Sequence, residues 1–123
     1  MTKPLAMLLF EKLLPGSQLI HRLEDLGYRV QSVGEPAQVV PQAEASKPLL
    51  IIADVEPRYQ AVCNVIGDLR LNKDTAHIPV IAIAAERNVQ ATQAARQAGA
   101  KLVVADNAIL QHLAQFLEQA LEV

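Results

Sequence analysis

Short apolar runs alternate along this chain with longer stretches whose apolar residues recur every three or four positions. Runs that are apolar at every position are typical of strands covered on both faces, and the helical stretches between them supply that cover. Alternation of this kind predicts βαβ units around a parallel sheet. The predicted strands are residues 5–10, 28–33, 49–53, 79–84 and 102–105.

Stretches of helical period separate these strands and follow the last one. Ser17 is expected to cap the first helix and Asn107 the last, because either side chain can accept a hydrogen bond from a first-turn amide. Gly27 and Gly99 are expected to end the first and fourth helices. Pro41 lies inside the second helix and costs about 3 kcal/mol unless it falls in a first turn. The predicted helices are residues 17–26, 36–45, 59–71, 89–98 and 108–121.

Composition limits the classes of function. The 123 residues are 51% hydrophobic and 20% charged, which suits one domain over residues 1–123 with its own core. A net charge of −2 and a pI of about 5.9 argue against nucleic acid or an anionic membrane as partners. A single cysteine, Cys63, excludes an intrachain disulfide and an all-cysteine metal site. The apolar runs are too short for a membrane span or a signal peptide, so we expect a cytoplasmic protein.

Three local stretches carry a resemblance to a known family. They are PLLIIAD at residues 48–54, HIPVIAIA at 77–84 and AGA at 98–100, and they occur in order at family spacing. Together they make the whole chain similar to the receiver domain of bacterial two-component response regulators. The resemblance implies an α/β doubly wound (βα)5 fold of the flavodoxin-like type, with a parallel five-stranded sheet in the order 2-1-3-4-5.

The resemblance places Asp54 in the phosphoacceptor position. The family spaces this aspartate four residues before a proline, whereas Asp54 precedes Pro57 by three, so aligning the prolines would put Ala53 there instead. We favour Asp54 because a loop tolerates a one-residue deletion better than a central strand tolerates a shift in register.

Receivers bind Mg²⁺ with a cluster of carboxylates that includes two acidic residues after the first strand. Here Glu11 fills at most one of these positions, with Phe10 or Lys12 in the other. The remnant of the acidic pocket is expected to comprise Glu11, Asp54 and Glu56. Mg²⁺ requires near-octahedral oxygen ligation, so the loss of one carboxylate weakens a Mg²⁺ site here. We therefore expect no bound metal, and a weak Mg²⁺ site is the alternative. We expect no other cofactor.

Other family positions are also replaced. Ala84, followed by Ala85, stands where receivers carry a Ser or Thr that bonds the acyl phosphate. Ala105, followed by Asp106 and Asn107, stands where they carry a Lys that pairs with the phosphoryl group, and Val103 falls near the aromatic switch residue. These replacements predict an atypical receiver, a pseudo-receiver with a degenerate phosphorylation site.

The remaining candidates for chemistry are weaker. His21, His77 and His112 lack the spacing of metal ligands, and Cys63 has no histidine near it in sequence, so we interpret all four as structural. A flavodoxin-like fold also suggests FMN, but residues 11–17 contain one Gly and one Ser and open with a carboxylate, which does not suit a phosphate-binding loop.

Our first hypothesis is a two-component signalling module that acts by protein–protein interaction, is independent of phosphorylation and has no catalysis of its own. The second is an active phosphoacceptor phosphorylated at Asp54, with Mg²⁺ held by Glu11 and Asp54. A flavodoxin-like ligand binder is the third. The partners expected are signalling proteins or a second copy of the chain. The family's interaction face would include Gln90, Gln93, Arg96, Gln97, Lys101 and Gln111.

Overall fold

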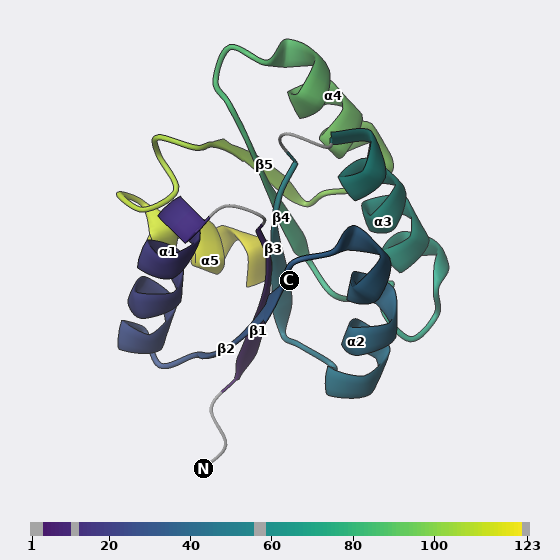
Figure 1. Ribbon diagram of the computed structural model, residues 1–123, viewed down its shortest axis with the longest axis horizontal. Coiled ribbons are helices and arrows are strands. Elements are labelled where there is room, and N and C mark those ends of the chain that lie inside the picture. Colours follow the sequence, from purple (N-terminus) through teal and green to yellow (C-terminus); the bar gives the residue numbers. More distant parts are fainter. Residues whose placement is uncertain (1–3, 11–12, 56–58, 122–123) are drawn as a thin grey trace.

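The computed structural model describes residues 4–10, 13–55 and 59–121. Its strands form one parallel five-stranded sheet in the order β2-β1-β3-β4-β5, which confirms the predicted topology (Figure 1). Each strand lies within one residue of its predicted bounds. The strands are β1 (Leu5–Leu9), β2 (Arg29–Val33), β3 (Leu50–Asp54), β4 (Val80–Ala84) and β5 (Leu102–Ala105).

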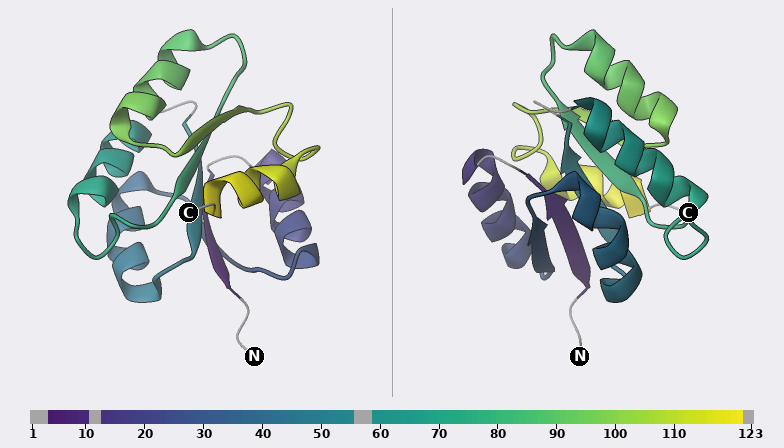
Figure 2. Two further views of the ribbon diagram at one scale, coloured as in Figure 1. Left: turned by 180° about the vertical axis from the view of Figure 1, so that it is seen from behind. Right: turned by 45° about the vertical axis from the view of Figure 1, so that its right-hand side comes forward.

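Helices cover both faces of this sheet. One face carries α1 and α5, and the other carries α2, α3 and α4 (Figures 1 and 2). A 3-10 turn, η1 (Pro36–Gln38), leads into α2. The helices are α1 (Leu13–Asp25), α2 (Val39–Ser46), α3 (Tyr59–Leu71), α4 (Val89–Ala98) and α5 (Leu113–Leu121).

Alternation along the central strand divides the core into two clusters. In β3, Ile51 and Ala53 pack with α2, α3 and α4, whereas Leu50 and Ile52 pack with α1 and α5. All four side chains are at most 2% exposed, as expected for a strand covered on both faces. The residues of α4 that face the sheet are small, with Ala91 and Ala95 fully buried, so this helix packs close to the sheet.

The first helix begins earlier than the sequence predicted. It starts at Leu13, so Ser17 lies inside α1 and is not its N-cap. Pro15 is the third residue of α1, and Pro41 is the third residue of α2. The amide of a first-turn residue has no partner within the helix, so a proline there sacrifices no hydrogen bond. Both prolines are therefore accommodated without the interior penalty.

The last helix begins later than predicted. Residues 106–112 form consecutive turns, and α5 starts at Leu113, so Asn107 does not cap it. The Asn107 side chain instead donates from Nδ2 to Oε2 of Glu86 at 3.3 Å, in the loop after β4. Ile109 is nevertheless fully buried in the cluster beneath α1 and α5, so the apolar pattern identified core positions while misplacing the helix start.

Gly99 and Gly67 provide a matched test of backbone constraint. Gly99 ends α4 at φ +119°, and a Cβ there would lie 2.7 Å from Cγ of Arg70. Gly67 lies within α3, where an added Cβ would meet nothing within 4 Å. We expect Gly99→Ala to destabilise the fold by at least about 1 kcal/mol. Gly67→Ala should stabilise it by about 0.5–1 kcal/mol, because alanine loses less backbone entropy in a helix.

Urea unfolding of the two variants and the wild type measures both effects. Equal shifts in the free energy of unfolding, or a more stable Gly99→Ala variant, would contradict the conformation assigned to the end of α4.

Candidate functional site

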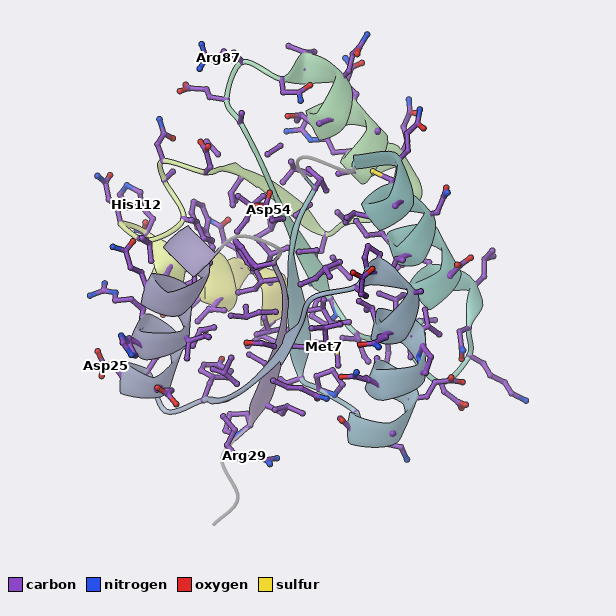
Figure 3. All side chains as sticks on the ribbon, viewed as in Figure 1. Met7, Asp25, Arg29, Asp54, Arg87 and His112 are labelled. Atoms are coloured by element: carbon purple, nitrogen blue, oxygen red, sulfur yellow. The ribbon has the colours of Figure 1, made fainter. Side chains whose placement is uncertain are left out.

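The candidate site lies at the carboxyl edge of the sheet, where Asp54 ends β3. Asp54 is half-buried, and in Figure 3 it lies at the end of the sheet opposite Arg29, the first residue of β2. Side chains alternate between the two faces of the sheet along β3, so Asp54 lies on the same face as Leu50 and Ile52. This is the face that α1 and α5 cover. The carboxyl edge is the place at which ligands meet open parallel sheets of this topology.

Asp54 has apolar neighbours on both adjacent strands. It pairs in register with Ile83 of β4. On β1, Leu9 pairs with Ala53, so Phe10 is the residue level with Asp54. Phe10 packs against the same core cluster as Ile83. The strand ends beside Asp54 therefore offer hydrocarbon side chains where a phosphoryl or metal site would need oxygen or nitrogen.

The alanines at the ends of β4 and β5 lie side by side. Ala84 pairs in register with Ala105, and the amide of Asp106 donates to the Ala84 carbonyl at 3.1 Å. Ala84 is buried and Ala105 half-buried. A methyl group neither donates a hydrogen bond nor carries charge, so this pair cannot orient or neutralise a phosphoryl group.

The loops after β4 and β5 form a depression of about 370 Å³ at this edge. It is lined by Ala85, Glu86, Arg87, Asp106 and Asn107. Two of these side chains are acidic and one is basic, so the lining opposes an incoming phosphate more than it attracts one. Arg87 lies far out on its loop in Figure 3.

Sequence reasoning did not single out Glu86 and Arg87. The signal was present, because both lie in the loop after β4, and Asp106 and Asn107 lie in the loop after the adjacent strand β5. Carboxyl ends of neighbouring parallel strands meet at one edge, so the two loops had to come together. The contact between Glu86 and Asn107 now links them.

The acidic pocket expected from the sequence can be checked only at Asp54. Glu11 and Glu56, and Lys12 beside Glu11, lie outside the residues that the structure describes. Within the described ranges, no three histidine, cysteine or acidic side chains come together as metal ligands. Mg²⁺ favours octahedral oxygen ligation, and the described side chains level with Asp54 supply no oxygen toward it. The described neighbours of Asp54 on β1 and β4 therefore supply no metal ligand.

The histidines and the cysteine are not assembled into a site. His21 is on α1, His77 is in the loop before β4, and all three histidines are exposed. His112 makes a T-shaped contact with Phe116, with ring centroids 6.2 Å apart. Cys63 is half-buried on α3 against the core, and burial raises the pKa of its thiol. A raised pKa keeps the thiol protonated at neutral pH and makes it a weak nucleophile.

The six residues expected on an interaction face are all exposed. Gln90, Gln93, Arg96 and Gln97 lie on α4, Lys101 immediately precedes β5, and Gln111 lies in the turns before α5. The α4 residues and Lys101 belong to the segments that lead into β5, an edge strand of the sheet (Figure 2). Gln111 instead lines a depression with Gln18, His21 and Arg22 of α1, so the structure does not bring all six residues together. Among the helices that the structure describes, none is long and apolar enough to cross a membrane.

Comparisons with known proteins identify the fold. No protein-family model matches this sequence, and no curated protein matches it. A proposed response regulator of Chloroflexus aurantiacus J-10-fl superposes with a TM-score of 0.90 at 19% identity, over 99% of this chain and 100% of that one. The receiver domain of sensor histidine kinase PA1611 from Pseudomonas aeruginosa PAO1, which has a magnesium ion in its active site cleft, gives 0.87 at 21%, over 99% and 100%.

A chemotaxis protein gives the same result. The response regulator CheY4 of Vibrio cholerae superposes with a TM-score of 0.84 at 17% identity, over 97% of this chain and 99% of that one. The similarity extends over whole chains, and the strand order agrees with it. The chain has the fold of a response-regulator receiver domain.

Proposed function

We propose that this protein is a pseudo-receiver, a cytoplasmic two-component signalling module that works by protein–protein interaction without being phosphorylated and without catalysis of its own. One observation carries the proposal: the strand ends around Asp54 present Phe10, Ile83 and the pair Ala84 and Ala105. Phosphoryl transfer depends almost entirely on positioning and charge stabilisation, and these side chains provide neither.

The loops at this edge support the same proposal. Asp106 follows the strand whose end carries a Lys in receivers, so a carboxylate is near the place where an ammonium would pair with the phosphoryl group. The side chains of Glu86 and Asn107 already connect the two loops. Because this hydrogen bond forms without a phosphoryl group, phosphorylation is not needed to hold the two loops together.

The surface around β5 is our candidate for partner binding. Both β2 and β5 are edge strands, but β2 has the sequence RVQSV with Arg29 and Ser32 exposed, whereas β5 has the apolar sequence LVVA. Polar and charged side chains protect a sheet edge from pairing, and β5 itself has none. We therefore place a protein partner, or a second copy of the chain, on the part of the expected face beside β5, which Gln90, Gln93, Arg96, Gln97 and Lys101 form.

The alternative function is an active phosphoacceptor at Asp54 with Mg²⁺ held by Glu11 and Asp54. The magnesium ion in the PA1611 receiver domain is the observation in its favour, because that domain shares this fold. A direct phosphorylation assay separates the two functions.

The first prediction concerns phosphorylation of Asp54. Incubation with acetyl phosphate or phosphoramidate and Mg²⁺ should leave the intact mass unchanged, because the described site offers no hydroxyl or ammonium to stabilise the transferred group. A receiver known to be competent, treated in parallel, controls for the reagents. A stoichiometric gain of one phosphoryl group that is abolished in Asp54→Asn would refute the proposal and establish the alternative.

The second prediction concerns the interaction face. Affinity capture from the native cytosol, quantified by mass spectrometry, should retain the same partners with wild type and Asp54→Asn. Arg96→Glu should lose them, because it reverses an exposed charge on α4 within the proposed face. Lys47→Glu makes the same charge change at the exposed end of α2, away from β5, and should behave as wild type.

Two results of this capture would contradict the proposal. One is loss of partners in Asp54→Asn with retention in Arg96→Glu, which would assign recognition to the phosphoacceptor. The other is equal loss in Arg96→Glu and Lys47→Glu, which would reflect net charge rather than a defined face.

A further inference from the structure

A second cavity lies at the amino edge of the sheet, opposite Asp54. Its volume is about 600 Å³, against about 370 Å³ for the depression at the carboxyl edge. Leu49, Pro79 and Lys101, each of which immediately precedes a strand, bring the starts of β3, β4 and β5 to this cavity. The end of α5 closes another side with Leu121. Cavities of this size are typical of sites for small molecules.

The lining combines an apolar floor with a basic rim. Leu49, Ala100 and Leu121 supply hydrocarbon surface, and Leu49 is 43% exposed although it is a large apolar residue. The charged side chains among the described lining residues are Arg70 and Lys101, both cationic, and His77 adds an imidazole. The described lining residues thus carry positive charge in a chain whose net charge is −2.

Arg70 is held in place before any ligand arrives. Its Nη1 donates to the Ala76 carbonyl at 3.2 Å, which uses one of the five N–H donors of the guanidinium. Its aliphatic stem runs beside Gly99, where a Cβ would meet Cγ of Arg70 at 2.7 Å. The positive φ of Gly99 and its missing side chain therefore make room for this arginine at the cavity wall. An oriented guanidinium is well suited to carboxylate, phosphate or sulfonate oxygens.

We propose that the amino-edge cavity binds a small organic anion, in which one negatively charged group meets Arg70 and an apolar body lies on Leu49, Ala100 and Leu121. Charge complementarity selects the anionic group, and the hydrocarbon floor selects the apolar body. The site is separate from Asp54 and does not depend on whether that residue is phosphorylated.

Two fluorescent probes with the same aromatic body test the proposal. We expect 1-anilinonaphthalene-8-sulfonate to bind the folded protein saturably with one site, and to shift the amide resonances of Val80, Ala100 and Leu121. In Arg70→Gln its Kd should rise by up to about fivefold, the upper range for an exposed charge pair. N-phenyl-1-naphthylamine lacks the sulfonate and should bind Arg70→Gln and wild type equally.

Matched variants keep the test specific. Lys73→Gln removes a cation from the turn next to α3 but outside the lining, and should leave the Kd of the sulfonate unchanged. Leu49→Asp places a carboxylate in the lining and should weaken binding at least as much as Arg70→Gln. Leu71→Asp makes the same change at a residue that is 88% exposed and outside the lining, and should not weaken it. Amide spectra of all four variants establish that each is folded, since partly folded states also bind this dye.

The proposal is overturned if the sulfonate shows no saturable binding. It is also overturned if Arg70→Gln and Lys73→Gln raise the Kd equally, if Leu49→Asp binds as wild type does, or if the shifted resonances lie at the carboxyl edge.

Discussion

The central strands of the sheet are buried on both faces, and this burial determines where polar side chains can be placed. Between Leu50 and Ala53, every side chain of β3 enters one of two apolar clusters, and the same is true of β4. A polar group inside these strands would lose its hydration without finding a partner, which costs roughly 2–7 kcal/mol. Polar chemistry within the sheet is therefore confined to the two ends of the strands, at its carboxyl and amino edges.

The two edges differ in what they present. At the carboxyl edge, Asp54 stands beside hydrocarbon neighbours, and acidic side chains occupy the loops after β4 and β5. At the amino edge, Arg70, His77 and Lys101 surround an apolar floor. The fold is that of a receiver domain, and the described neighbours of Asp54 on the adjacent strands are hydrocarbon side chains. A module of this kind is expected to signal through its surface.

The fold could be predicted from the sequence because strands that are buried on both faces are continuous apolar runs. Runs such as residues 49–53 identified the strands, and their order came from the resemblance to receivers. Helix starts were less predictable, because Ser17 and Asn107 are good caps in isolation but neither begins a helix. Pro15 could enter the first turn of α1, and Asn107 instead contacts Glu86, which lies 21 residues away in the chain. The residues at which α1 and α5 begin therefore depend on the folded structure around them and not on local capping propensity alone.

The candidate site was predictable where it depended on strand register. Ala84 and Ala105 were identified by position, and the structure pairs them. The contact between Glu86 and Asn107 and the orientation of Arg70 beside Gly99 were not foreseen, because each joins segments through packing and not through a local motif. Glu11 and Glu56 remain expectations from the sequence.

The most direct measurement of the central claim is an amide NMR titration with Mg²⁺ followed by beryllofluoride, which imitates an acyl phosphate on aspartate. We expect the resonances of Asp54, Ala84 and Asp106 not to move, because the described neighbours of Asp54 on β1 and β4 supply no ligand for the ion or the phosphate mimic. Saturable shifts of these resonances that disappear in Asp54→Asn would contradict it and show a working phosphorylation site.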